Sequence, residues 1–431
     1  MLSPPTASSG LLRVVSRWQI VALAVNGVIG SGIYLLPAST AALLGPASVW
    51  AVLLAGLTVA LLVLCFAQAS SYFDQAGGAY LYTREAFGEF VGFQIGWMTW
   101  LSRVVSVAAL AAGLAQALGQ LSPALTGALA AALIATLGIA LVTAVNWIGV
   151  QSGARFGVVL VLVKLLPLAL LIGVGAFHLD PSALRVEHWP APSSFAAAAL
   201  LLLFAYGGFE NAPAAAAEYR QPQRDLPFAL VATILIVTLV YVSIQAVALG
   251  LLPGLAQSKA PLAEAAERLG GAPAVWLLTV GAAVSILGTM GSSTLFGPRY
   301  LYALAADGYG PRPLAEVHPR WHTPHRALAV QGTLALLLAL TGSFVELALL
   351  SVIARLCTYI GTAAALLVLI PRYQHQPEAL RLPGGRLIAA LALLISLGLL
   401  ASADARHLGA GVVAVVLGSL VYAARRRPPR S

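Results

Sequence analysis

The sequence predicts an all-α protein that crosses a membrane many times, and three observations support this fold class. Hydrophobic residues make up 60% of the 431 residues, charged residues only 9%, and the mean hydropathy is +0.89. In a typical soluble domain about a quarter of the residues are charged. Apolar runs long enough to cross a bilayer recur along the chain, and two of them carry glycines at mid-depth.

A membrane-crossing helix needs about 20 apolar residues, and runs of this length predict about twelve spans. In chain order they cover residues 17–42, 46–71, 90–119, 124–147, 153–177, 194–216, 227–252, 272–304, 325–342, 346–370, 386–402 and 406–424. The first run follows Arg13 and Arg17, as a secretory signal would, but it exceeds the usual ~7–15-residue apolar core of such signals. We therefore expect a retained first span. No connecting segment is long or polar enough to predict a separate soluble domain.

The distribution of basic residues predicts the orientation. With the N-terminus inside, seventeen of the 24 Lys and Arg fall on the cytoplasmic side and four on the other. Because Lys and Arg are enriched in cytoplasmic loops, both termini are predicted to be cytoplasmic, in a bacterial inner membrane. The two longest polar inner loops are Gln75 to Phe90 and Asp307 to Ala327. The net charge of +9 thus reflects topology, and we expect no nucleic-acid partner.

Several classes of chemistry lack their sequence signals. There is no G-x-x-x-x-G-K-[ST] phosphate loop, and GVIGSG lies inside an apolar run rather than after a strand. The cysteines, Cys65 and Cys357, also lie in apolar runs without metal-ligand spacing. We therefore expect no ATP, no cofactor, no metal and no enzymatic activity.

Two apolar runs are interrupted at corresponding places. The first span contains VNGVIGSGIYLLP, in which Gly27, Gly30 and Gly32 surround Ser31, and the sixth contains FAYGGFENAP. Matched interruptions of this kind indicate two inverted repeats with a substrate site at the breaks. We predict five-span repeats at 17–177 and 194–370, followed by two appended spans at 386–424.

The backbone groups freed at the two breaks predict the charge of the ligand. A single glycine in a membrane helix is often only a packing contact, but a cluster of glycines can unwind a turn. Unwinding frees N–H groups at the start of the outer half-helix, where the positive dipole end suits a carboxylate. At the second break, the freed carbonyls around Ala205 to Gly207 suit an ammonium group. Together the breaks predict a site for a zwitterion, in which the cavity-lining side chains set the substrate's size.

Lys164 lies within the fifth span, about ten residues or ~15 Å from its cytoplasmic end. A charge this deep is costly and usually faces a cavity or a partner. The chain has two lysines among its 24 basic residues, and a desolvated lysine can lose its proton whereas an arginine effectively cannot. We therefore favour a coupling role for Lys164 over a fixed ion pair.

Other side chains near the breaks are weaker candidates. Arg103 in the third span and Glu210 after the second break are predicted to take part in coupling with Lys164. They either approach each other inside the bundle, or Glu210 is itself a protonation site. A static charge pair that holds helices together is equally open. Arg355 in the tenth span has a weaker case. The aromatic residues Phe204, Tyr206 and Phe209 flank the second break, where they could close over a substrate.

Several of these segments together resemble the amino acid–polyamine–organocation (APC) superfamily of permeases. They are GVIGSGIYLLP, FAYGGFEN, EYRQPQRDLPFAL, the fifth-span lysine and GPRYLYALAADGYGP, and the resemblance covers about residues 15–425. It implies the LeuT fold, alternating access and amino acid transport without ATP.

The resemblance also implies residue roles. Lys164 corresponds to a lysine that fills the space of a sodium ion in several members, which favours proton-linked transport or sodium-independent exchange. The remaining roles concern substrate contacts: Gly30, Ser31 and Gly32 for the carboxylate, carbonyls of Ala205, Tyr206 and Gly207 for the α-amino group, Gly27 and Val28 as pocket lining, and Phe204 as a gate.

The sequence differs from family members that transport cationic amino acids. Where some of them have a large aromatic residue in the eighth span, this chain has Ser293, and its third-span pocket positions correspond to Val107 and Leu110. No acidic residue except Glu210 is near enough to pair with a cationic side chain. We therefore predict proton-coupled transport of neutral L-amino acids. An amino acid/amine exchanger is the alternative, and a non-transporting amino acid sensor is a third reading.

Overall fold

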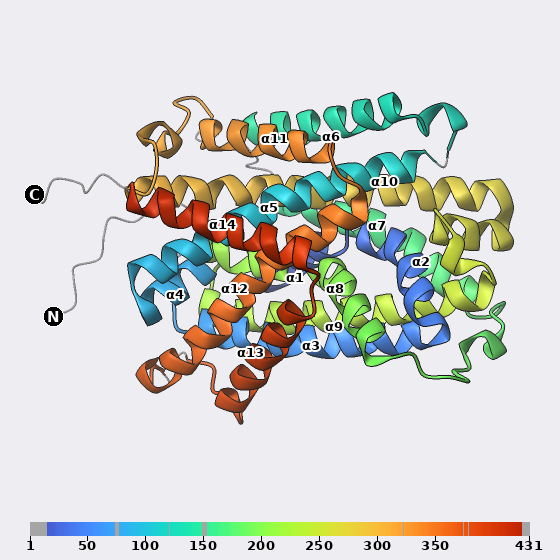
Figure 1. The fold of residues 1–431 in the computed structure, drawn as a ribbon, viewed down its shortest axis with the longest axis horizontal. Helices are drawn as coiled ribbons and strands as arrows, with labels where there is room; N and C mark the ends of the chain where they lie inside the picture. Colours follow the sequence, from blue (N-terminus) through green and yellow to red (C-terminus); the bar gives the residue numbers. More distant parts are fainter. Residues whose placement is uncertain are drawn as a thin grey trace, which may run out of the picture.

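The computed structural model describes residues 15–73, 77–119, 121–148, 153–321, 323–373, 375–377 and 379–424, with backbone alone for 153–160, 215, 217 and 218. Within these ranges the chain forms helices joined by short connections, and the only β pairing is an isolated bridge between Val15 and Tyr219. The helices pack side by side into one bundle (Figure 1).

The α-helices are α1 (Arg17–Val28), α2 (Gly32–Leu44), α3 (Ser48–Ser70), α4 (Ala79–Phe87), α5 (Glu89–Leu118), α6 (Ala128–Ile148), α7 (Gly153–Gly175), α8 (Pro192–Tyr206), α9 (Pro222–Leu251), α10 (Pro261–Ala306), α11 (His325–Ala339), α12 (Phe344–Tyr373), α13 (Gly385–Ala401) and α14 (Ala405–Ala423). The 3-10 helices are η1 (Gly45–Ala47), η2 (Pro123–Leu125), η3 (Pro181–Leu184), η4 (Phe209–Glu218), η5 (Leu255–Gln257) and η6 (Arg312–Ala315).

The chain is an all-α polytopic membrane protein. Among the described residues, seven helical segments are long and apolar enough to cross a membrane, one of which runs from Gly32 to Ser70 through α2 and α3. Four further apolar helices are shorter. Outward-facing leucines such as Leu129 and Leu137 of α6 are 76% and 67% exposed. Such a surface suits contact with lipid, whose hydrocarbon core is as apolar as leucine.

The chain breaks at both places that the sequence predicts. At the first break, α1 ends at Val28, Ile29 is extended (φ −73°, ψ 101°) and α2 begins at Gly32. At the second, α8 ends at Tyr206, and Gly208 has a φ of +130° before the chain continues as η4. Only glycine adopts such a φ readily, so Gly208 is what permits the second break.

The two breaks lie against each other near the centre of the bundle, where Figure 1 labels α1 and α8. A Cβ atom built on Gly208 would collide with the backbone carbonyl of Gly27. One built on Gly32 would lie 2.7 Å from the Cα of Ala205. The backbones of the two broken helices therefore touch without room for side chains between them.

The two predicted inner loops meet at one end of the bundle. Arg84 of α4 forms an ion pair with Asp307, with Nη1 and Oδ2 3.1 Å apart, and the Tyr80 hydroxyl also donates to Asp307. Tyr309 stacks on Tyr422 near the end of α14. The segments after the second and eighth spans and the last described helix therefore share one end of the molecule.

Some element bounds differ from those that the sequence predicts. The loop from Gln75 to Phe90 contains the helix α4, and α9 begins at Pro222, several residues before the predicted span. Helix α10 includes an additional segment that begins at Pro261 and joins the eighth span through a kink at Gly270 and Gly271. Polar and amphipathic helical segments at membrane boundaries lack the long apolar run on which the predicted spans rest.

Candidate functional site

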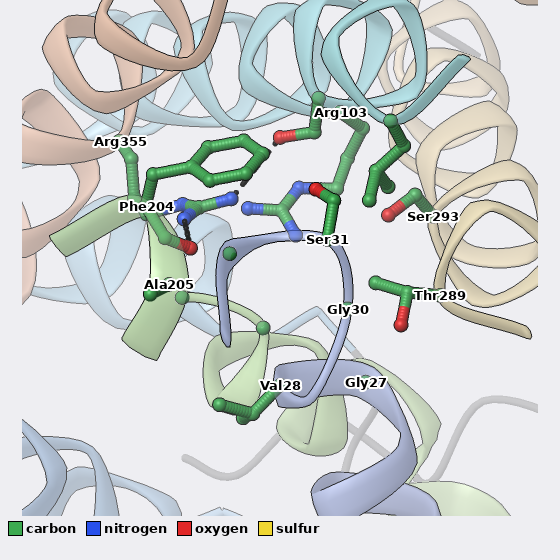
Figure 2. A pocket seen from close by; sticks show the side chains of 15 residues that line it. Gly27, Val28, Gly30, Ser31, Arg103, Phe204, Ala205, Thr289, Ser293 and Arg355 are labelled. Carbon is green, nitrogen blue, oxygen red and sulfur yellow. Dashed lines mark hydrogen bonds between the residues drawn. The ribbon is translucent and has the colours of Figure 1, made fainter. Parts of the chain in front are cut away.

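A buried cavity of about 20 Å³ lies between the two breaks (Figure 2). Nine of the ten predicted substrate residues line it, and Tyr206 is the exception. Arg103 of the predicted coupling residues also lines it, whereas Lys164 and Glu210 do not. The full lining is Gly27, Val28, Gly30, Ser31, Gly32, Arg103, Ser106, Leu110, Phe204, Ala205, Gly207, Gly208, Thr289, Ser293 and Arg355.

The first break presents the start of α2 to the cavity. The amides of Tyr34 and Leu35 donate to the carbonyl of Ser31, at 3.1 and 3.0 Å, and so begin the helix. The amides that precede them have no partner within α2, and they carry the positive end of its dipole. The hydroxyl of Ser31 is fully buried and has no hydrogen-bond partner among the residues that the structure describes. This wall can accept a carboxylate.

Lys164 of α7 holds the other side of the first break. Its Nζ donates to the carbonyls of Asn26 and Ile29, at 3.0 and 2.7 Å, at the end of α1. The hydroxyls of Ser285 and Thr289 on α10 donate to the same region, with Thr289 reaching both carbonyls. A cation at this position faces the negative end of the α1 dipole. Lys164 therefore fixes the shape of the break whose amides face the cavity.

Glu210 lies at the centre of a buried charge network. Its Oε1 is 2.5 Å from Nη2 of Arg103 and 3.0 Å from Nε of Arg355. Its Oε2 accepts from the amide of Gly208 at 2.8 Å and from the Tyr359 hydroxyl at 3.4 Å. The predicted approach of Arg103 and Glu210 is present. Two guanidinium groups share one carboxylate, so these three side chains carry a net positive charge in the cavity wall.

Arg355 of α12, for which the sequence supports only a weak functional case, lines the cavity. Its Nη1 lies 3.4 Å from the carbonyl of Leu203 and 3.5 Å from that of Phe204, at the end of α8. Its Nη2 donates to Ser106 of α5 at 3.1 Å. Figure 2 shows its guanidinium beside the Phe204 ring, whose centroid is 6.0 Å from Cζ.

The aromatic side chains at the second break behave differently from one another. Phe204 lines the cavity and packs edge-on against Phe344, with ring centroids 5.7 Å apart. Tyr206 points away, because its hydroxyl donates to the carbonyl of Val52 on α3 at 3.0 Å. Phe209 stacks on Tyr359. The expectation that the side chains of Tyr206 and Phe209 close over the cavity is therefore wrong, and only Phe204 is placed to do so.

Four further residues outside the predicted set also line the cavity: Ser106, Leu110, Gly208 and Thr289. Leu110 matches a third-span pocket position that the resemblance implies, whereas Val107 is not in the lining. Ser106 and Thr289 were missed because small hydroxyl residues are common in membrane helices and the sequence does not show which face they occupy. Gly208 was predicted as part of the break but not as lining. In the described part of the chain, no group of three or more His, Cys, Asp or Glu side chains could hold a metal ion.

The fold and the site define a class: a polytopic membrane permease whose two broken helices meet at a small buried cavity. A family described as amino acid permease matches residues 15–406. The chain belongs to this family, within the APC superfamily, and is an amino acid transporter rather than an enzyme.

Three relatives from Bacillus subtilis (strain 168) match almost the whole chain. It is 29% identical to a methylthioribose transporter and 26% identical to the branched-chain amino acid permease BcaP, and each match covers 98% of this chain and 95% of the relative. It is 27% identical to the serine/threonine exchanger SteT, over 97% of this chain and 98% of the relative. The described helices and these bacterial relatives indicate a plasma-membrane location.

Proposed function

We propose that this protein is a secondary active transporter that carries neutral L-amino acids by proton-coupled alternating access. The observation that carries the proposal is the cavity between the breaks, which has the start of α2 on one side and the end of α8 on the other. A zwitterion needs one negative and one positive partner, and the two helix ends supply opposite partial charges. The unpartnered Ser31 hydroxyl adds a donor on the carboxylate side.

The proposed architecture is twelve spans in the LeuT arrangement, with both termini cytoplasmic. In this arrangement α1 and α2 form one broken span and α8 and η4 another. The segment from Gly32 to Ser70 holds α2 of the first span and α3 of the second, so the seven long segments and the four shorter apolar helices together account for twelve spans. Helices α13 and α14 form the appended pair. The meeting of α4, Tyr309 and Tyr422 at one end supports a shared cytoplasmic side for those segments.

The charge network supports a substrate without a cationic side chain. Glu210 is the carboxylate that pairs with the lining residues Arg103 and Arg355, so it is already engaged by two cations. A cationic side chain on the substrate, in addition to its α-ammonium group, would therefore meet excess positive charge rather than a free acid. Two of the relatives reported above are named for branched-chain amino acids and for serine and threonine, which are neutral substrates.

Lys164 supports proton coupling as the mode of transport. In the described part of the chain its ammonium group forms no ion pair and is held by the carbonyls of Asn26 and Ile29, so its protonation state would change the first break directly. Sodium-independent exchange is the second candidate, favoured by the likeness to the serine/threonine exchanger.

The proposal is tested by reconstituting the purified protein in liposomes. Uptake of labelled neutral, cationic and acidic amino acids is measured without sodium, with and without an inwardly directed proton gradient, and with or without internal amino acid. We expect neutral amino acids to accumulate when the gradient is imposed. Uptake that needs internal amino acid and ignores the gradient would replace symport with exchange, and no uptake under any condition would refute the transport function.

A further inference from the structure

The end of α8 is occupied by a cation that belongs to the protein. The amide of Gly207 bonds to the carbonyl of Phe204, three residues earlier, at 3.2 Å. This tightening draws that amide away from the carbonyl of Leu203, which Nη1 of Arg355 contacts at 3.4 Å. Carbonyls at a helix end carry partial negative charge and need donors, and a helix end buried within the membrane has no bulk water to supply them. Arg355 supplies these donors from α12.

The guanidinium fills the space beside the second break. A Cβ atom built on Gly207 would overlap the guanidinium of Arg355. The cavity that remains, about 20 Å³, has room for little more than one water molecule. An α-ammonium group directed at the end of α8 would therefore need the position that Nη1 now holds, so the two cations exclude each other.

Arg355 has an ion pair and a hydrogen bond on one side and only weak contacts on the other. On the side away from α8, Nε lies 3.0 Å from Oε1 of Glu210, an ion pair without hydrogen-bond geometry, and Nη2 donates to the Ser106 hydroxyl at 3.1 Å. Toward α8, the contacts of Nη1 are 3.4 and 3.5 Å, at the weak limit for a hydrogen bond. The guanidinium can leave the carbonyls of α8 and keep its anchors on Glu210 and Ser106.

We propose that Arg355 is a tethered cation that exchanges places with the substrate's α-ammonium group, so that the carrier can close and reorient without substrate. The proposal rests on the amino acid transport proposed above. With substrate bound, the ammonium group caps the end of α8 and Arg355 withdraws toward Glu210. Without substrate, Arg355 caps the end of α8, where the Leu203 carbonyl has lost the amide of Gly207.

The inference predicts net transport rather than obligatory exchange. A carrier that closes only around its substrate must return loaded, and it then exchanges one substrate molecule for another. A carrier with its own cation for this site can return unloaded and complete a net cycle. Removal of the guanidinium should therefore slow the unloaded return and leave the loaded return nearly unchanged.

The test compares net uptake into amino-acid-free liposomes with exchange against internal amino acid, for wild type and Arg355→Met. We expect Arg355→Met to lower net uptake at least tenfold and to keep exchange within about threefold of wild type. Arg84→Met is the matched control, since Arg84 pairs with Asp307 at the end of the bundle, and it should leave the ratio of the two rates unchanged.

Arg355→Lys provides a second variant that keeps the charge in the network and tests the proposal if the methionine variant does not fold. Its ammonium group lacks the fork that joins Ser106 to the end of α8, so the ratio of net uptake to exchange should fall several-fold. A ratio that equals wild type in a folded variant overturns the inference, as does a wild type that performs exchange alone. Absence of amino acid transport by wild type in both assays would instead refute the proposed function itself.

Discussion

Gly208 has a backbone conformation that other residues rarely adopt. Its φ is +130°, and it crosses the first break where a side chain would meet the carbonyl of Gly27. Both facts require glycine, because other residues rarely adopt this φ and because a Cβ atom would collide with the Gly27 carbonyl. Of the two glycines in FAYGGFEN, this one is needed for the chain to turn, while Gly207 leaves room for Arg355.

Substitution of Gly208 by alanine should destabilise the protein and stop transport. Strain at such a conformation costs on the order of 1–3 kcal/mol, and the contact with Gly27 adds to it. Gly291→Ala is the control, because a Cβ on Gly291 of α10 meets no atom within 4 Å. Thermal unfolding in detergent should show a lower midpoint for Gly208→Ala alone. Equal midpoints for wild type and both variants would contradict the packing described for the two breaks.

Lys164 provides a second prediction at the residue scale. Lys164→Ala removes the ammonium group from the carbonyls of Asn26 and Ile29 and leaves them the hydroxyls of Ser285 and Thr289. We expect uptake by this variant to lose its stimulation by an inward proton gradient. Lys259→Ala, which changes the other lysine of the chain at an exposed position, should keep it. Stimulation that persists in Lys164→Ala would remove this lysine from coupling.

At the scale of elements, the charge network joins α5, η4 and α12. Arg103 comes from α5, Glu210 from η4 and Arg355 from α12, and all three side chains are at most 3% exposed. The network is asymmetric, because it contains two guanidinium groups and one carboxylate that both of them share. Removal of Glu210 leaves two buried cations, but removal of Arg103 still leaves Glu210 paired with Arg355.

This asymmetry predicts the outcome of a double-mutant cycle. Glu210→Gln should destabilise the protein more than Arg103→Met, since breaking a buried pair costs about 3–5 kcal/mol and the first change leaves more uncompensated charge. The double variant should be less destabilised than the sum of the single variants, with a coupling on the order of 1–3 kcal/mol. If the losses of unfolding free energy in the two single variants simply add to that of the double variant, the contact between the two residues contributes nothing.

The sequence predicts the breaks better than it predicts what surrounds them. Clustered glycines identify both interruptions, because local backbone freedom is encoded locally. The position of Arg355 at the end of α8 depends on how α12 crosses α8, which hydropathy does not describe. The same holds for Thr289, whose hydroxyl reaches the first break only because α10 packs against α1. Hydropathy thus indicates how deep these residues lie in the membrane but does not identify their partners.

At the scale of the whole molecule, the end of the bundle that carries α4 joins distant parts of the chain. Asp307 pairs with Arg84, and Tyr309 stacks on Tyr422. The distribution of Lys and Arg predicts that these segments share the cytoplasmic side, and their contacts agree with a common side. The helix α4 inside the first of these loops was not predicted, because a short helix with charged residues has no long apolar run.

The central claim is that the two breaks bind the two main-chain charges of an amino acid. It is tested most directly by competition against uptake of the best neutral substrate, with three unlabelled compounds: the same amino acid, its methyl ester and its deaminated carboxylic acid. The ester lacks the carboxylate for the start of α2, and the acid lacks the ammonium group for the end of α8. We expect each analogue to compete at least tenfold less well than the parent, a loss of about 1.4 kcal/mol or more. Competition by both analogues as strong as that of the parent amino acid would contradict the claim.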